Sequence, residues 1–247
     1  MSKYNKYIFI VFLFLANIFA SSEQVALVLK TKGNVQYQKY SEKVLSTLNI
    51  GTALYNDDLL RTGADGLVVF VYIDDKTMIK IQSNSEVYIR GESENESIIK
   101  QINIGNGRVK STVSKQKKGE FTIVTPTSVA SVKGTEFWTI VDRDGEDRFY
   151  GLSGTVEVKN LSSGQIVGLE ENTTAISLPD GTINIRQTNE LELPQEDIYE
   201  IEGDLDDIEN FGKDSTIEVF DNTTESELRI KLQNAFGEEK EIIVRYR

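Results

Sequence analysis

The chain has 247 residues, of which 39% are hydrophobic, so it can bury one good core with or without a small appendage. It contains no Cys and no His, which excludes disulfides, thiol nucleophiles, Cys/His zinc sites, His-ligated haem and Ser-His-Asp triads. A formal net charge of -12 repels phosphate backbones, so nucleic acid is not expected as a partner.

Residues 1–20 are predicted to be a secretory signal peptide. Lys3 and Lys6 make a basic start, the run from Ile8 to Ala16 is apolar, and small residues from Ala20 onward place the cleavage after Ala20. The apolar run is short for a bilayer span, and an uncleaved N-terminal membrane anchor is the alternative. In both cases the rest of the chain is expected outside the cytoplasm. A Cys-free exported protein fits the periplasm or envelope of a bacterium.

Short apolar runs rich in β-branched residues, broken by turn residues, follow from Val25 to about Arg186. The run Leu67–Ile73 is apolar on both faces and predicts a central strand covered on two sides. Further strands are expected over residues 79–81, 87–89, 98–104, 108–113, 121–125, 128–132, 136–141, 148–152 and 155–158, with turns at Asn106-Gly107, Asp144-Gly145 and Asp180-Gly181. The pattern predicts an all-β domain over residues 21–188, a solenoid-like β-sandwich of many short strands.

The remaining chain divides into two parts. Residues 189–212 form a predicted acidic linker, a solvated tether with a helix from about Gln195 to Asn210 as the alternative. Residues 213–247 form a small C-terminal β unit, with strands expected over 217–220, 228–232 and 242–246. Three strands alone are marginally stable, so this unit is expected to pack on the main body or on a partner.

Several motifs follow one another through the main body. They are GTALYNDDLLRTG from Gly51, GNGRVKSTV from Gly105, FTIVTPTSVASVKGTEF from Phe121, GLSGTVEVKN from Gly151 and GQIVGL from Gly164. In this order, and with this separation between TP and GT, they resemble the FecR-domain family over roughly residues 33–178. The resemblance implies an all-β, solenoid-like module of the bacterial envelope.

The best-known members of that family are anti-sigma regulators that sense an outer-membrane transporter. Such a regulator needs a cytoplasmic segment and a transmembrane helix before the β domain, and here only a few residues precede the apolar run. The anti-sigma activity is therefore not carried over. A stand-alone exported module that binds a protein or glycan of the envelope is expected by analogy.

The positions that carry the resemblance are expected to serve the backbone and the core. They are Arg61, Thr62, Gly63, Gly107, Arg108, Val109, Thr125, Pro126, Gly134, Thr135 and Phe137. Residues 61–63 are predicted to form a turn, with Arg61 pairing a neighbouring carboxylate. Thr125-Pro126 predicts an extended turn, and Gly134 a bend or a close approach. The Thr135 hydroxyl is expected to bond the local backbone, while Phe137 points into the core and Trp138 faces the other way.

No catalytic, cofactor or metal residue is assigned. Paired carboxylates are the one remaining route to catalysis, as in glycoside hydrolysis, and the candidates are Asp57-Asp58, Asp74-Asp75, Asp142 with Asp144, Glu146-Asp147 and Glu170-Glu171. All lie at strand ends or turns, where acidic residues are common, so a hydrolase is the least favoured hypothesis.

Polysaccharide or cell-wall binding is the second hypothesis. It would need two or three aromatic side chains on one exposed face, drawn from Tyr37, Tyr40, Tyr88, Trp138 and Tyr150. Tyr37 and Tyr40 are close enough in sequence to be exposed together. The favoured hypothesis is a non-catalytic exported module that binds a partner in the cell envelope.

Overall fold

The computed structural model describes residues 24–42, 44–94, 97–116 and 119–195, and the backbone of three strands over 216–221, 227–233 and 239–245. The predicted signal peptide and the alternative helix over 195–210 lie outside the described residues, apart from residue 195. In the described residues, no helix is long and apolar enough to cross a membrane.

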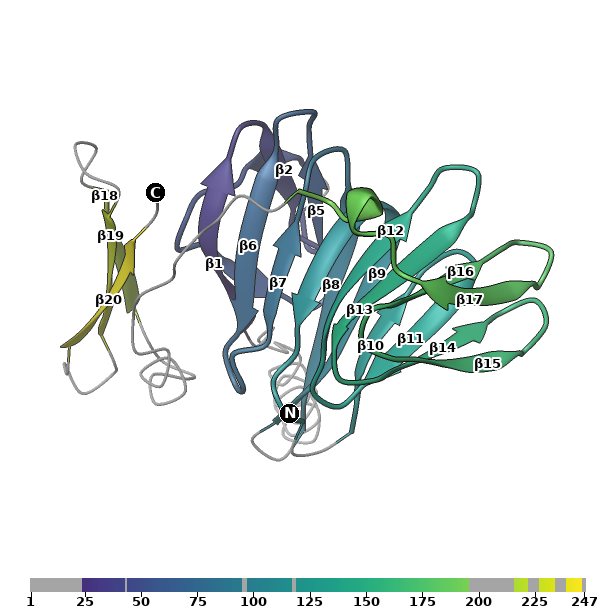
Figure 1. Ribbon diagram of the computed structural model, residues 1–247. Coiled ribbons are helices and arrows are strands. Elements are labelled where there is room, and N and C mark those ends of the chain that lie inside the picture. The colour runs from purple at the N-terminus through teal and green to yellow at the C-terminus, as the bar shows by residue number, and fades with distance from the viewer. Residues whose placement is uncertain are drawn as a thin grey trace, which may run out of the picture.

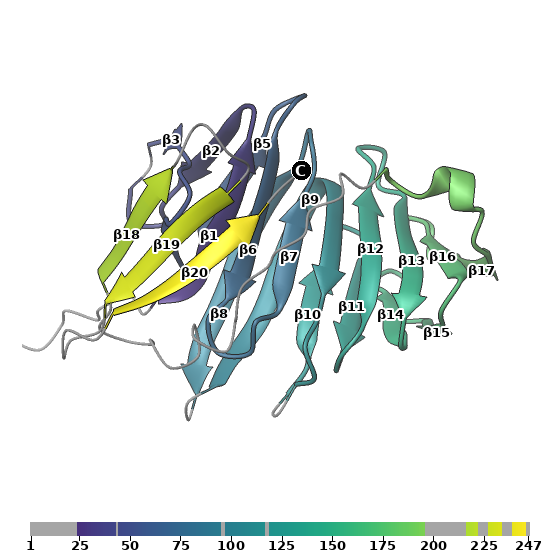
Figure 2. The same cartoon turned by 60° about the vertical axis from the view of Figure 1, so that its left-hand side comes forward.

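Two rows of strands make up the main body (Figures 1 and 2). The first row runs in the order β4 (Ala53–Tyr55), β1 (Gln24–Lys32), β6 (Leu67–Tyr72), β7 (Met78–Ile81), β9 (Ser97–Thr112), β12 (Glu136–Val141), β13 (Asp147–Ser153), β16 (Thr173–Ser177) and β17 (Ile183–Gln187). The second runs β3 (Ser46–Thr47), β2 (Val35–Gln38), β5 (Asp58–Thr62), β8 (Glu86–Glu94), β9, β10 (Phe121–Val124), β11 (Ser128–Val132), β14 (Val156–Asn160) and β15 (Ile166–Leu169). Since β9 belongs to both rows, 17 strands form one continuous sheet folded upon itself. The all-β prediction is confirmed.

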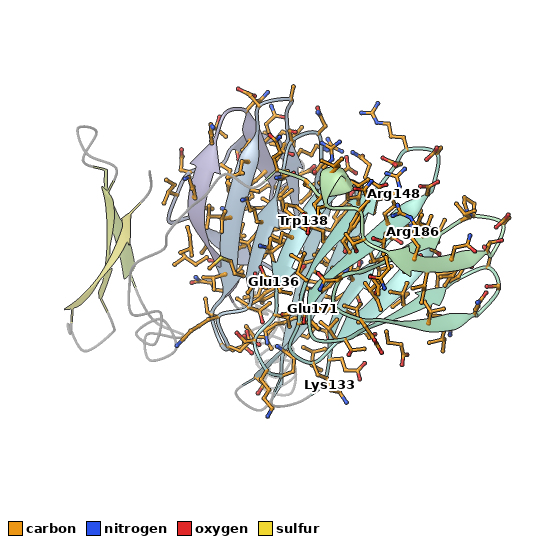
Figure 3. All side chains as sticks on the ribbon, viewed as in Figure 1. Lys133, Glu136, Trp138, Arg148, Glu171 and Arg186 are labelled. Atoms are coloured by element: carbon orange, nitrogen blue, oxygen red, sulfur yellow. The ribbon has the colours of Figure 1, made fainter. Side chains whose placement is uncertain are left out.

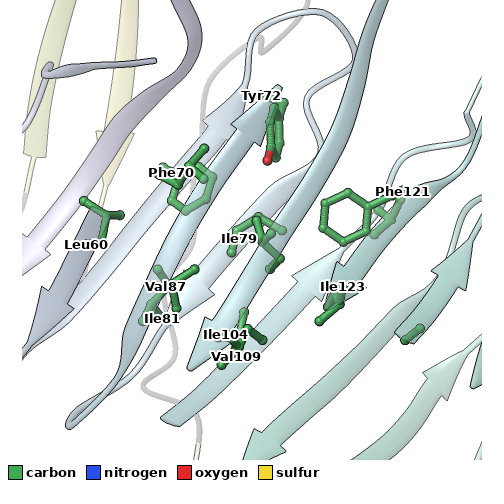
Figure 4. Close-up of a cluster of buried hydrophobic side chains, with 14 of the residues drawn as sticks. Leu60, Phe70, Tyr72, Ile79, Ile81, Val87, Ile104, Val109, Phe121 and Ile123 are labelled. Carbon is green, nitrogen blue, oxygen red and sulfur yellow. The ribbon is translucent and has the colours of Figure 1, made fainter. Parts of the chain in front are cut away.

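The hydrophobic core fills the space between the two rows. Alternate residues of each strand point inward, as Phe70 of β6, Ile79 of β7, Val87 of β8 and Phe121 of β10 do in Figure 4. Strand β6 is buried along its whole length, so the predicted central strand is confirmed. At its end the Tyr72 hydroxyl donates to the carbonyl oxygen of Arg90 at 3.0 Å, which satisfies the one polar atom of that side chain.

Residues 98–113 were predicted as two strands with a turn at Asn106-Gly107, and this is wrong. Residues 98–112 belong to one 16-residue strand, β9, whose first part pairs with β8 and whose last part pairs with β7 and β12. Where β9 changes partners, the register with β8 shifts at Glu86/Val87, and the inward side chains change from Ile102 and Ile104 to Val109. Gly105 is the extra residue of a bulge here, and Gly107, at a φ of 119°, follows it where β9 continues alongside β12 in place of a hairpin turn.

Several other strands follow the predicted bounds closely, whereas the strand expected over residues 87–89 is the longer β8 (Glu86–Glu94). Strands β11 and β12 have the predicted bounds, and β10, β13 and β14 differ by one or two residues at their ends. The chain turns at Asp142–Gly145 and at Asp180-Gly181, as the Asp-Gly pairs indicated. Residues 61 and 62 were predicted in a turn but end strand β5, because their backbones pair with β2 and β8, and the turn begins at Gly63.

The C-terminal strands form a separate antiparallel sheet in the order β18 (Thr216–Asp221), β19 (Glu227–Gln233) and β20 (Glu239–Arg245). The three predicted strands are therefore present. A single turn of 3-10 helix, η1 (Glu190–Glu192), follows β17 and is capped by the side chain of Asn189.

Candidate functional site

The first group of family-signature residues closes the turn between β5 and β6. Arg61 Nε lies 2.8 Å from Glu86 Oε2, so the predicted pairing with a carboxylate is present. The buried Thr62 hydroxyl donates to the carbonyl oxygen of Gln82 at 2.6 Å and accepts from the Ser85 backbone at 2.9 Å. These bonds tie β5 to the β7–β8 turn.

The TP motif surrounds a buried carboxylate, Asp147. The hydroxyls of Thr125 and Thr127 both donate to Asp147 Oδ2, and Thr125 also caps the turn by accepting from the Ser128 backbone at 2.8 Å. Burial raises the pKa of Asp147, and the two hydroxyl hydrogen bonds oppose that rise. Thr125-Pro126 forms the predicted turn between β10 and β11, and its role includes holding this carboxylate.

The GT motif fixes the start of β12. Gly134 has a φ of 147°, and a Cβ there would lie 3.2 Å from the Cα of Lys115, so the predicted close approach is present. The prediction for the Thr135 side chain is wrong: its hydroxyl is buried and has no hydrogen-bond partner among the described residues, while its backbone pairs with Val113. Strand pairing already occupies the local backbone groups that this hydroxyl was expected to reach.

Phe137 and Trp138 lie on opposite faces of β12, as the alternation predicts. Phe137 belongs to the core between the rows. Trp138 packs on the outer face of the first row with Ile140, Tyr150 and Leu193. Leu193 follows η1, so the segment after β17 folds back over the outside of β12 and β13 and buries the Trp ring.

A groove lies beside this outer cluster. It consists of two adjoining cavities of about 750 and 590 Å³, which share Ser83, Arg108, Ile140 and Asp142. We call this region the Arg108 groove. Its lining comes from distant parts of the chain, from Lys32 at the end of β1 to Gln195 after η1.

The Arg108 groove is slightly basic, whereas the chain as a whole is acidic. Its charged lining residues are Lys32, Arg108, Arg143, Arg148 and Arg186 against Asp65, Asp142, Asp144 and Glu192. Basic side chains thus slightly outnumber acidic ones here, whereas the whole chain has 27 basic and 39 acidic residues. Figure 3 shows Arg148 and Arg186 on the side of the molecule that carries η1.

Two ion pairs hold four of the nine charged side chains of the groove. Arg148 lies 3.0 Å from Asp142 Oδ2 and 2.6 Å from Glu146 Oε1. Arg186 pairs with Glu192, and its hydrogen bond lowers the pKa of that carboxyl group. Arg108, in contrast, is exposed, and among the described residues no carboxylate pairs with its guanidinium. A partner could therefore contact Arg108 without first breaking an ion pair.

Two of the candidate carboxylate pairs, Asp57-Asp58 and Asp74-Asp75, have structural partners. Asp58 accepts from the backbones of Tyr40 and Tyr55 at 3.0 Å, and Asp57 pairs with Arg90 at 2.8 Å. Asp74 and Asp75 both contact Lys100, at 2.7 and 2.9 Å. These contacts do not support the hydrolase hypothesis, because they hold the carboxylates in structural roles. Within the described residues no group of three or more acidic side chains could hold a metal ion.

Lys100 is a residue that sequence reasoning missed. Its ammonium group is buried between Asp74, Asp75 and Gln116, and it lies 5.9 Å from the centre of the Tyr72 ring. A signal was present, because Lys100 falls in phase with the inward-facing Ile98 and Ile102 along β9. These contacts attach the β6–β7 turn to the part of β9 that belongs to the second row.

The five candidate aromatic residues, all in the described part of the chain, do not form the platform that glycan binding was expected to use. Tyr37 is only 7% exposed whereas Tyr40 is 75% exposed, so the prediction that they are exposed together is wrong. Tyr37 points into the core from β2, and Trp138 and Tyr150 are buried in the outer cluster. Of the five candidates, only Tyr40 and Tyr88 reach solvent.

Comparison with known proteins places these motifs in a family. Residues 58–157 match the family model described as FecR protein. The chain contains a FecR domain. The match begins in β5 and ends in β14, and it includes every signature residue from Arg61 to Phe137.

Two crystal structures from Parabacteroides distasonis ATCC 8503, each described as a "putative anti-sigma factor", are similar to this chain. They share 16% and 18% sequence identity with it, with TM-scores of 0.45 and 0.44. Each alignment covers 52% of this chain and 59% of the solved chain, so this chain spans less than two thirds of those proteins. A comparison with curated proteins finds no match.

Proposed function

We propose that the chain is a non-catalytic, extracytoplasmic FecR-domain module that binds a partner protein of the bacterial cell envelope through the Arg108 groove. The observation that carries the proposal is the setting of Arg108. This family-signature residue is exposed, its guanidinium has no carboxylate partner among the described residues, and it lines both cavities of the groove. Arginine is enriched at protein interfaces because its planar, permanently charged group binds carboxylates in a bidentate manner.

The geometry of the groove fits a protein partner better than a small substrate. Its lining is mostly polar and charged, and its ion pairs lie at the edge of a sandwich. Small-molecule sites are typically apolar and enclosed. The basic groove of an acidic chain fits a partner surface that presents carboxylates.

The predicted signal peptide supports the extracytoplasmic location in this proposal. A chain with a basic start, an apolar run and small residues at Ala20 has the layout of an exported protein. The periplasm of a bacterium is the compartment that fits this layout.

Site-specific photo-crosslinking in intact cells tests the proposal. A photoreactive amino acid at position 108 is expected to capture a discrete protein adduct, and the adduct should be absent when it is placed at Lys159, an exposed residue of β14 on the opposite row. Equal adducts at both positions, or capture of cell-wall glycan in place of protein, would contradict the proposal.

A further inference from the structure

Strands β1 and β6 are buried on both of their faces. Val68 and Phe70 point into the core between the rows. The alternating residues on the outer face are also buried: Leu67, Val69 and Val71 of β6, and Leu27 and Leu29 of β1, none more than 5% exposed. Leu27 and Val71 are direct partners across the two strands, so these side chains form one continuous apolar strip.

Neither apolar cluster of the described residues contains this strip. The core cluster holds the inward residues, and the second cluster lies farther along the row around Trp138. Farther along the same outer face, β9 carries Arg108 and Lys110. The strip is therefore local to β1 and β6, and its burial requires a covering layer.

The chain leads toward this strip where its main body ends. After η1, Leu193, Pro194 and Gln195 line the same cavity as Leu67 of β6. The Gln82 side chain, at the end of β7, donates to the carbonyl oxygen of Gln195 at 2.9 Å. Twenty residues then separate Gln195 from Thr216, which is ample to reach any point of a nine-residue strand.

The strand register of the C-terminal sheet aligns apolar residues of neighbouring strands, as a layer that covers the strip would need. Apolar residues predominate in one set of aligned positions, in which Ile230 of β19 is opposite both Val219 of β18 and Ile242 of β20. Leu228 is opposite Val244, and Leu232 is opposite Ile217. Arg229 and Lys231 occupy the alternate positions of β19. A three-stranded sheet of this kind needs a second apolar surface for stability.

We propose that the C-terminal sheet of the same chain docks through its apolar positions on the outer strip of β1 and β6. The sandwich thereby gains a third layer beside the Arg108 groove. This inference is independent of the proposed partner binding, since it concerns only contacts within one chain.

The absence of Cys from the sequence makes a disulfide test direct. In the full chain, Val69→Cys is combined in turn with Leu228→Cys, Ile230→Cys or Ile242→Cys, and the chain is oxidised under mild conditions. At least one of these pairs is expected to form an intramolecular disulfide in most molecules. The matched controls combine Val69→Cys with Arg229→Cys or Lys231→Cys, which occupy the alternate register positions and should not link.

Each other outcome overturns the inference. Equal linking of test and control pairs would show that the sheet does not dock by its apolar positions. Links found only between two chains would show that a second copy covers the strip. If no pair links, thiol labelling of the single Val69→Cys variant decides: rapid labelling means the strip is uncovered, and protection without any link means another segment covers it.

Discussion

Asp147 illustrates how a carboxylate that would suit catalysis can serve the fold instead. It is fully buried at the start of β13, and the hydroxyls of Thr125 and Thr127 donate to it. Burial raises its pKa above the usual 3.8, so folding favours the protonated form. Its contribution to stability is then complete below about pH 3.8 and is lost as the pH rises through the raised, folded-state pKa.

The variant Asp147→Asn tests this pH dependence, because an amide stays neutral. The free energy of unfolding of the variant relative to wild type should increase as the pH rises from below 3.8 toward neutral, and then level off. Urea unfolding across that range measures it, with Asp144→Asn on the exposed turn as the control for net charge. A difference that stays flat, or falls with rising pH, would contradict the account.

Lys100 makes a second prediction at the scale of single residues. Replacing it by Met leaves Asp74 and Asp75 buried without their cation, which is expected to cost about 3–5 kcal/mol of unfolding free energy. Lys133→Met is the matched control, because Lys133 is 72% exposed and pairs with Glu120 at the surface, and it should cost less than about 1 kcal/mol. Chemical denaturation compares the two. Similar costs would show that the buried cluster is not important for stability.

At the scale of elements, strand β9 depends on Gly107, beside its bulge at Gly105. A Cβ at Gly107 would lie 2.1 Å from Ser85 Oγ, and the φ of 119° is unfavourable for any other residue. We expect Gly107→Ala to lower the free energy of unfolding by about 2–4 kcal/mol. Gly168→Ala in edge strand β15, where nothing lies within 4 Å of an added Cβ, should change it by about 0.5 kcal/mol or less. Equal effects would show that position 107 tolerates a side chain.

The strands that could be predicted from the sequence are those whose hydrophobic pattern and turn residues are compatible with a single structure. Strand β6 is apolar throughout, and Asp144-Gly145 lies between two alternating runs, so both were identified correctly. Strand β9 was divided in two because Asn-Gly is the usual signal of a hairpin. Here the strand instead has its extra residue at Gly105 and continues through Gly107 from one row to the other, and no local pattern separates these two uses of glycine.

At the scale of the whole molecule, the groove could not be predicted. Its residues are spread from Lys32 to Gln195, and they meet only because nine strands of one row bring the ends of β1, β7, β9 and β13 together. The family motifs did identify Arg108, but they predicted only a role in supporting the backbone and the core. The fold gives it a setting that sequence could not show, at the junction of two cavities and without a carboxylate partner among the described residues.

Partner binding through the groove is the central claim, and a binding titration tests it most directly. The envelope protein captured at position 108 is titrated against the purified full chain, its Arg108→Glu variant and its Lys159→Glu variant. Both substitutions change the net charge equally and lie on exposed strand positions. We predict that Arg108→Glu weakens binding at least about tenfold, a loss of about 1.4 kcal/mol, while Lys159→Glu binds like wild type. Equal affinities for all three chains would contradict a binding role for the Arg108 groove.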